Sequence, residues 1–364
     1  MAPLLSHQPL KAIATLILIA SAPLYLAALS LVYVAKKYRP VPEWTVQTAV
    51  GNEWLRLFYI YAARIHLQPY FANASRLKDR YVLVQPGPSE LYTGIVQSNM
   101  IQPAPMPGIW FPEKPGKSEI KSCKVVIHFQ GGAFVTATDP VDTGRVPARI
   151  FTDKLSAATF YAQYRLSRNE DSRFPAAVQD VISFYRYVLE QGVDPQNIII
   201  SGDSAGGNLV IGLLRYIQDT AILPTPRGVM LWSPWVDVSQ HALSAYAKSK
   251  SLRTDFLSLG LLQWGKAAYE PTSNGEEADR YLRPVKHPFG THVPIFVNAG
   301  TAELFYDDIS KFADRMKELE GNKLLYMETK NSPHDVLVAG SFIGFIGEAE
   351  SAVEQAGAFF NCWD

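Results

Sequence analysis

The chain has few of the residues that would mark a disulfide-stapled, metal-binding or nucleic-acid-binding protein. Its 364 residues include only two cysteines, Cys123 and Cys362, and no spacing typical of metal ligands. The 34 basic and 34 acidic residues balance, so the positive surplus that favours contact with nucleic acid is missing. These absences argue against a disulfide framework, a metal site and a nucleic-acid partner. They leave the oligomeric state open.

Apolar residues, in contrast, make up 48% of the chain, and one long run of them carries no charge. Residues 12–35 contain no Asp, Glu, Lys, Arg or His, and about 20 apolar residues suffice to cross a bilayer. A cleaved signal peptide is the alternative, but its apolar region is usually only about 7–15 residues long. A buried core helix is less favoured because the run is apolar on all faces and lies at the extreme end of the chain. We therefore predict that residues 1–40 form an N-terminal membrane anchor with a transmembrane helix.

Beyond the anchor, the pattern predicts an α/β domain with a helical cap. Residues 41–78 are aromatic-rich and expected to be helical, whereas residues 81–115 carry seven prolines between short runs that suit edge strands. From residue 121 onward, apolar runs alternate with helical patterns, which predicts a mostly parallel sheet flanked by helices. The expected strands are 123–129, 197–201, 228–234, 294–300 and 323–329, and the expected helices are 176–192, 208–219 and 347–360. We assign residues 79–364 to a catalytic domain, with a cap built from residues 41–78 and an insertion at about 238–290.

The pentapeptide Gly202-Asp203-Ser204-Ala205-Gly206 matches the pattern G-x-S-x-G. In a nucleophile elbow, the serine sits in a strained strand-to-helix turn, and glycines at the flanking positions relieve crowding. A glycine-rich turn without any chemical role would fit the pentapeptide alone equally well. Here an apolar strand precedes the turn and an apolar helix follows it, so we predict Ser204 to be a nucleophile.

A serine nucleophile needs a general base, which is itself oriented by a carboxylate. In this architecture the acid and then the histidine follow the serine along the chain. Of the seven histidines, only His334 lies beyond every plausible acid. It follows the expected strand 323–329, where a loop can carry it over the sheet edge. We therefore predict His334 to be the base.

Three carboxylates compete for the role of the acid. Glu303 lies three residues past the expected strand 294–300, where ligand chemistry concentrates in open α/β sheets. Asp307 and Asp308 precede a helical pattern and suit its first turn. Glu303 is therefore the preferred acid.

Acyl transfer to a serine would also need hydrogen-bond donors for the oxyanion that develops in the transition state. The segment Gln130-Gly131-Gly132-Ala133-Phe134 follows the expected strand 123–129, at the position of an oxyanion loop. A plain glycine turn is the alternative for this piece alone. The expected donors are the backbone N–H groups of Gly131, Gly132 and Ala205.

Several of these blocks together resemble the hormone-sensitive-lipase-like branch of the α/β-hydrolases, which includes arylacetamide deacetylases and fungal steryl acetyl hydrolases. The blocks are HFQGGAFV, YRLSRNEDSRFPAAVQD, DPQNIIISGDSAGGNL, LWSPWVD, NAGTAELFYDD and SPHDVLV. The resemblance covers the chain from about residue 85 to its C-terminus. It implies the α/β-hydrolase fold, Ser204 as nucleophile, His334 as base, and Glu303 at the position that is usually Asp.

The sequence departs from that family at two positions of the oxyanion loop. Gln130 stands where the family usually has His, and Ala133 replaces the third glycine. The histidine of the family mostly shapes the loop through a hydrogen bond, so the glutamine bears on loop geometry more than on chemistry.

These features predict a membrane-anchored serine hydrolase that cleaves carboxylic esters without a metal or organic cofactor. One alternative keeps the same triad but transfers the acyl group to an alcohol or cleaves an amide. The other is a non-catalytic binder, as in the gibberellin receptors, which resemble this family but have lost the catalytic histidine. Retention of Ser204, Glu303 and His334 favours an enzyme over a binder.

The sequence is less informative about the substrate and about the side of the membrane on which the catalytic domain lies. Six aromatic residues of the expected cap favour an apolar alcohol, such as a sterol, a terpenoid or another secondary metabolite; they are Trp54, Phe58, Tyr59, Tyr61, Tyr70 and Phe71. The resemblance to deacetylases implies a short acyl group, acetyl above all. Basic residues after the apolar run favour a cytoplasmic catalytic domain. The resemblance and the acceptor triplet Asn73-Ala74-Ser75 favour the lumen of the endoplasmic reticulum, which we prefer.

Overall fold

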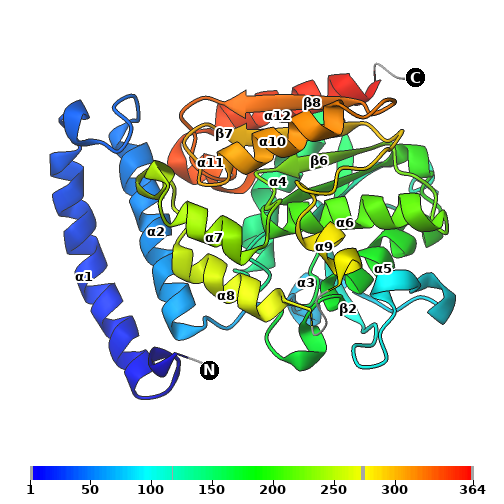
Figure 1. The fold of residues 1–364 in the computed structure, drawn as a ribbon, viewed down its shortest axis with the longest axis horizontal. Helices are drawn as coiled ribbons and strands as arrows, with labels where there is room; N and C mark the ends of the chain where they lie inside the picture. Colours follow the sequence, from blue (N-terminus) through cyan, green and yellow to red (C-terminus); the bar gives the residue numbers. More distant parts are fainter. Residues whose placement is uncertain (1–2, 117, 272–274, 362–364) are drawn as a thin grey trace.

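The central feature of the molecule is an eight-stranded sheet in the order β1-β2-β4-β3-β5-β6-β7-β8 (Figure 1). The computed structural model describes residues 3–116, 118–271 and 275–361. Strands β3 to β8 are parallel, and β1 and β2 add an antiparallel edge. The strands are β1 Tyr81–Val84, β2 Met106–Phe111, β3 Lys124–Phe129, β4 Ala157–Ala162, β5 Ile198–Asp203, β6 Gly228–Trp232, β7 Ile295–Gly300 and β8 Leu324–Thr329. The predicted α/β fold and the proline-rich edge strands are confirmed.

Helices cover both faces of this sheet and extend beyond one end of it. The α-helices are α1 Leu10–Val32, α2 Val46–Ile65, α3 Ala74–Leu77, α4 Pro140–Leu155, α5 Ala176–Glu190, α6 Ala205–Thr220, α7 Gln240–Tyr246, α8 Leu259–Tyr269, α9 Glu276–Leu282, α10 Tyr306–Lys317, α11 Val336–Ile343 and α12 Ile346–Asn361. The three helices expected from the sequence form as α5, α6 and α12. Strand β4 and helix α4 were not among the expected elements.

Along each buried strand, successive side chains belong alternately to the cores on the two faces of the sheet. In β3, Val125, Ile127 and Phe129 belong to the cluster beneath α5, α6 and α10, whereas Val126 belongs to the cluster beneath α4, α11 and α12. Successive strand residues point to opposite faces, so a strand covered on both sides must be apolar throughout. This explains why the strands read as continuous apolar runs.

Helices from two distant parts of the chain pack together at one side of the sheet. Helix α2 contacts α8 and α11, and α7 contacts α8 (Figure 1). Thus residues 41–78 and the insertion at 238–290, both expected to be helical, do supply neighbouring helices. Not all of the insertion is peripheral, however, because Asp255, Phe256 and Leu257 are buried.

Helix α1 runs along α2 at the edge of the molecule (Figure 1). The hydroxyls of Thr15 and Tyr61 lie 2.6 Å apart, and Tyr25 donates a hydrogen bond to Glu53 at 3.2 Å. Helix α1 has 23 residues, a mean hydropathy of 2.2 in its most apolar window, and almost no buried surface. Its length and composition make it a candidate membrane span, and a signal sequence would meet the same criteria.

Candidate active site

Ser204 occupies a strained turn between β5 and α6. Its φ of 52° and ψ of −116° lie outside the regions that L-residues ordinarily adopt, and it caps the N-terminus of α6. Glycines make the turn possible. A Cβ on Gly206 would overlap the carbonyl of Phe129, and one on Gly202 would overlap the carbonyl of Gly206. The segment therefore has the geometry of a nucleophile elbow, with the serine at the carboxyl end of a central strand.

The loops after β7 and β8 bring Glu303 and His334 together. Nδ1 of His334 lies 3.6 Å from Oε2 of Glu303, and both side chains are buried. The His334 ring is held edge-on between the rings of Phe256 and Phe305, with centroid distances of 5.7 and 5.3 Å. A distance of 3.6 Å is longer than a hydrogen bond, although such pairs are often loose without substrate.

The Glu303 carboxyl group is buried and accepts a side-chain hydrogen bond from Ser233. Ser233 Oγ donates to Glu303 Oε2 at 2.5 Å, and the same oxygen of Ser233 accepts the N–H of Asp335 at 2.9 Å. Burial raises the pKa of Glu303 to about 8, and the Ser233 hydrogen bond opposes that rise. Ionisation of Glu303 is therefore costly unless a positive charge forms beside it, and protonated His334 would supply that charge.

The two competing aspartates lie in the first turn of α10. Asp308 accepts a hydrogen bond from Tyr246 of α7, and Asp307 is exposed. The helix-initiating position expected from the sequence is therefore observed for both. Neither forms an ion pair with His334 among the described residues.

The three residues expected to supply oxyanion donors, Gly131, Gly132 and Ala205, all lie beside Ser204. Gly131 lies against the side chains of Asp203 and Ser204, and a Cβ on it would overlap Asp203 Oδ2. Gly132 and Ala133 line the cavity that contains Ser204. Both adopt positive φ, at 101° and 51°. Ala205 is the first residue of α6, where amides have no partner within the helix.

Tyrosines hold Gln130 in the loop where the family usually has His. Tyr161 donates to the side-chain oxygen of Gln130 at 3.3 Å, and Tyr164 donates to its backbone carbonyl at 2.9 Å. Gln130 is buried, so both bonds are shielded from water. The loop therefore keeps a defined shape without the family's histidine.

A buried polar cluster beneath this loop was missed in the sequence. His128 Nε2 lies 3.2 Å from Asp203 Oδ1, and His128 Nδ1 lies 3.0 Å from Ser201 Oγ. Burial lowers the pKa of His128 to about 4 and raises that of Asp203 to about 6. Burial, together with the charge of Asp203, also raises the pKa of Asp335. Chain order had set His128 aside as a base, and nothing in the sequence places it beside the residue that precedes Ser204.

Ser204 and His334 face one cavity of about 210 Å³. Its walls are largely apolar, and they come from α2, the start of α8, and α11; they include Leu55, Phe58, Tyr59, Phe256, Leu257, Leu261, Leu262, Val338, Ala339 and Phe342. Of the six aromatic residues expected to shape the cap, only Phe58 and Tyr59 are among these walls. Tyr61 contacts α1 instead, and Tyr70 and Phe71 are exposed.

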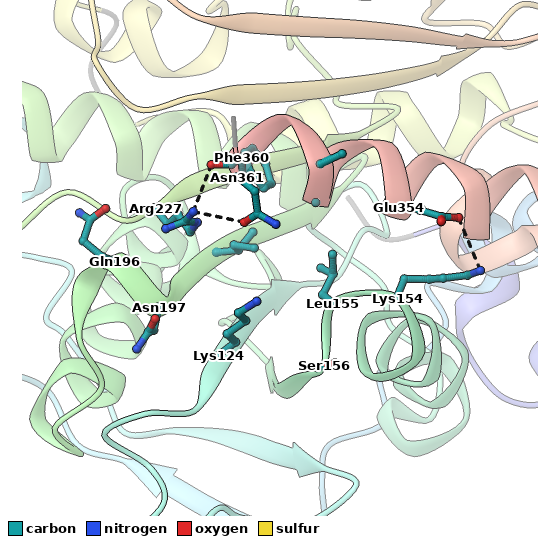
Figure 2. Close-up of a pocket in the computed structure, with 13 residues that line it drawn as sticks. Lys124, Lys154, Leu155, Ser156, Gln196, Asn197, Arg227, Glu354, Phe360 and Asn361 are labelled. Carbon is teal, nitrogen blue, oxygen red and sulfur yellow. Dashed lines mark hydrogen bonds and ion pairs between the residues drawn. The ribbon is translucent and has the colours of Figure 1, made fainter. Parts of the chain in front are cut away.

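A larger cavity, of about 590 Å³, lies at the opposite end of the strands (Figure 2). It is lined by Lys124 at the start of β3, by Arg227 just before β6, and by the ends of α4 and α12. Figure 2 shows Lys154 pairing with Glu354 there, and Arg227 reaching Phe360 and Asn361. None of the predicted site residues lines this cavity. In the described part of the chain, no group of three or more His, Cys, Asp or Glu side chains could hold a metal ion.

The strained serine turn and the order of the strands are those of the α/β-hydrolase fold. The family model described as alpha/beta hydrolase fold matches residues 126–338, and the chain belongs to this family. The resemblance stated from the sequence motifs is thereby confirmed.

Three relatives illustrate the comparison. An esterase from Acinetobacter venetianus is 27% identical over 56% of this chain and 65% of its own length. An acetyl-hydrolase from Streptomyces hygroscopicus is 26% identical over 65% of this chain and 75% of its own. The crystal structure of an esterase from the bacterial hormone-sensitive lipase family matches 87% of this chain and 98% of its own, with a TM-score of 0.62 and 20% identity. The sequence relatives support a hydrolase of the carboxylesterase type.

Proposed function

We propose that this protein is a serine hydrolase that removes a short acyl group, acetyl above all, from an apolar alcohol. The proposal rests chiefly on one arrangement, in which a strained serine and a histidine face the same apolar cavity and a buried carboxylate lies behind the histidine. The acetyl-hydrolase among the relatives favours acetate as the acyl group.

The residues present suffice for a two-step ester hydrolysis. Ser204 Oγ attacks the ester carbonyl while His334 takes its proton, and Glu303 stabilises the imidazolium that forms. The amides of Gly131, Gly132 and Ala205 donate to the oxyanion. His334 then protonates the leaving alcohol, and water releases the acid from acyl-Ser204 by the same sequence of proton transfers.

The size and lining of the cavity support a small acyl group and an apolar alcohol. A volume of about 210 Å³ lies below the usual range for drug-sized ligands, about 300–1,000 Å³, and α2 and α11 form part of its apolar wall. The aromatic rings of Phe58, Tyr59, Phe256 and Phe342 offer contacts to a sterol or terpenoid skeleton rather than to a sugar.

A chain-length series of p-nitrophenyl esters tests this proposal. We expect kcat/KM to be highest from acetate to butyrate and to fall for longer acyl chains, with Ser204→Ala inactive but folded. A fluorophosphonate probe should label the wild-type protein at Ser204. A maximum at twelve carbons or beyond, or undiminished turnover by Ser204→Ala, would overturn the proposal.

We also propose that α1 anchors the enzyme and that the catalytic domain faces the lumen of the endoplasmic reticulum. Asn73 is exposed, as a glycosylation acceptor must be, and lies at the start of α3. An endoglycosidase should therefore shift the mobility of the wild-type chain but not that of Asn73→Gln. Digestion of the catalytic domain by protease added to sealed microsomes would contradict this orientation.

A further inference from the structure

One acidic side chain, Asp255, is fully buried between the acid and base loops without taking part in the proposed chemistry. It lies in the chain segment that leads to α8, inside the region expected to be cap. No cation forms an ion pair with it among the described residues. A buried charge without such a partner must be compensated by other donors.

Three backbone amides supply that compensation. Asp255 Oδ2 accepts the N–H of Leu304 at 2.6 Å, and Oδ1 accepts the N–H groups of Leu257 and His334, each at 3.3 Å. Leu304 directly follows Glu303 along the chain. One carboxylate thus binds the backbone of the base itself and that of the neighbour of the acid.

The residues on either side of Asp255 extend the same connection. Thr254 donates from its hydroxyl to the carbonyl of Ala302 at 2.7 Å, in the acid loop. The ring of Phe256 packs edge-on against His334 and stacks on Tyr59 of α2 at 5.7 Å. Residues 254–256 therefore contact the acid loop, the base and the covering helix at once.

We propose that Asp255 is a positioning residue. It fixes the acid loop and the base loop relative to each other, and its neighbour Phe256 connects these loops to α2 over the cavity. The physical basis is the geometry of its two oxygens, which fix two backbone segments from different strands relative to each other. An error of about 1 Å in the placement of a catalytic group can cost about 10²-fold in rate. For its turnover readouts the inference rests on the proposed function, but its structural part does not.

Asp255→Asn is the test, because Asn keeps the shape and replaces one acceptor by a donor that would oppose the N–H of Leu304. We expect kcat for p-nitrophenyl acetate to fall at least tenfold, with KM changed less than twofold. The titratable groups facing Asp255 are His334 and Glu303. Loss of the like charge that opposes ionisation of Glu303 should also move the acid limb of the pH–rate profile to lower pH.

Hydrogen–deuterium exchange provides a readout that does not depend on activity. In Asp255→Asn, the amides of Leu304 and His334 should exchange at least tenfold faster, whereas those of β5 should not change. Asp180→Asn is the matched control, because Asp180 is also buried but pairs with Arg165 away from both loops. It should lower Tm without changing kcat, the pH profile or exchange in the two loops. Thr254→Val is a milder second variant, with a smaller loss of kcat and faster exchange in the acid loop.

The outcomes separate the two claims. If wild-type protein neither turns over esters nor reacts with fluorophosphonate, the proposed function fails, and amide exchange alone decides the role of Asp255. Wild-type exchange at Leu304 and His334 in a folded Asp255→Asn protein would overturn the inference. So would equal losses of kcat in Asp255→Asn and Asp180→Asn. If Asp255→Asn does not fold, unchanged exchange and kcat in Thr254→Val would overturn it instead.

Discussion

At the scale of single residues, Glu303 occupies an environment that works against its own charge. It is buried, its pKa is raised to about 8, and its side chain has Ser233 as a hydrogen-bond donor. Such a carboxylate gains most from a cation that appears only during the reaction, because the ion pair then offsets the cost of its burial. A role in the reaction is therefore consistent with its otherwise unfavourable position.

Glu303→Gln should lower kcat by orders of magnitude, about 10⁴-fold if the loss equals that of an analogous substitution in a serine protease. The amide neither fixes the tautomer of His334 nor stabilises its imidazolium. Steady-state kinetics with p-nitrophenyl acetate would measure the effect. Asp308→Asn serves as the control, since it perturbs the bond to Tyr246 and should change Tm more than kcat. Inactivity of a folded Asp308→Asn protein would contradict the assignment of the acid.

Ser233→Ala should shift the acid limb of the pH–rate profile upward. The Ser233 hydrogen bond favours the charged form of Glu303 and lowers its pKa, so its removal raises that pKa and leaves less carboxylate at a given pH. A hydrogen bond to a charged group contributes about 1.5–3 kcal/mol, which corresponds to about one to two pH units. Rates measured from about pH 5 to about pH 9, a range that includes the raised pKa of Glu303, would reveal the shift. An unchanged profile would show that Ser233 does not act through Glu303.

The sequence predicted the residues whose roles follow from local pattern and chain order, and missed those brought together by packing. Ser204 has a motif on both sides, and Glu303 and His334 follow strand ends that alternation made visible. His128, Asp203 and Asp255 have no such signal, because they approach one loop or another only after the sheet has formed. Spacing along the chain does not report those distances.

At the scale of secondary-structure elements, local pattern predicts β3 and β5, whereas α4 depends on tertiary packing. The two strands are continuous apolar runs, as burial on both faces requires. Helix α4 contains Gly144 and Pro147 and many polar residues, so its helical pattern is masked. It forms because Ile150, Phe151 and Leu155 pack against the sheet together with α12, which is tertiary information.

The close contact between the start of α6 and strands β3 and β5 leads to a prediction at this scale. Gly206→Ala should prevent the elbow from closing, because the new Cβ would overlap the backbone carbonyl of Phe129, which cannot move without breaking the sheet. We expect a cost of about 3 kcal/mol or more, which for a chain of 364 residues lowers Tm by roughly 4 °C or more.

Gly347→Ala in α12 is the matched control for that substitution. A Cβ there would have no atom within 4 Å, and alanine favours a helix over glycine by up to about 1 kcal/mol. Thermal unfolding followed by circular dichroism should therefore show a lower Tm for Gly206→Ala and an equal or higher Tm for Gly347→Ala. A folded Gly206→Ala protein with the Tm of the wild type would refute the account of the elbow.

At the scale of the whole molecule, α1 is a long apolar helix of which most of the surface is exposed. Large apolar side chains along it are exposed, among them Leu16, Ile17, Ile19, Leu24 and Leu31, although its final turn is joined to the body. Leu29 and Tyr33 pack into the cluster that also contains Trp44, and Trp44 donates to the carbonyl of Asn331 in the base loop. An exposed helix of this composition favours transfer into a bilayer.

Two truncations separate anchoring from support of the fold. Deletion of residues 1–28 should release a soluble enzyme that keeps Leu29 and Tyr33, with wild-type Tm and kcat/KM toward p-nitrophenyl acetate. Deletion of residues 1–40 should also be soluble but less stable, because it removes those two packing residues from the core while leaving Trp44 in place.

The full chain should stay with the membrane pellet after alkaline carbonate washing, and both truncations should appear in the supernatant. Mass spectrometry of the membrane-bound protein should find residues 12–35 intact, since an anchor is retained and a signal peptide is removed. If expression of the full chain yields a carbonate-soluble product that begins after residue 20, α1 is a cleaved signal instead. The enzyme would then meet its substrates away from the bilayer, and the argument for an apolar alcohol would rest on the cavity lining alone.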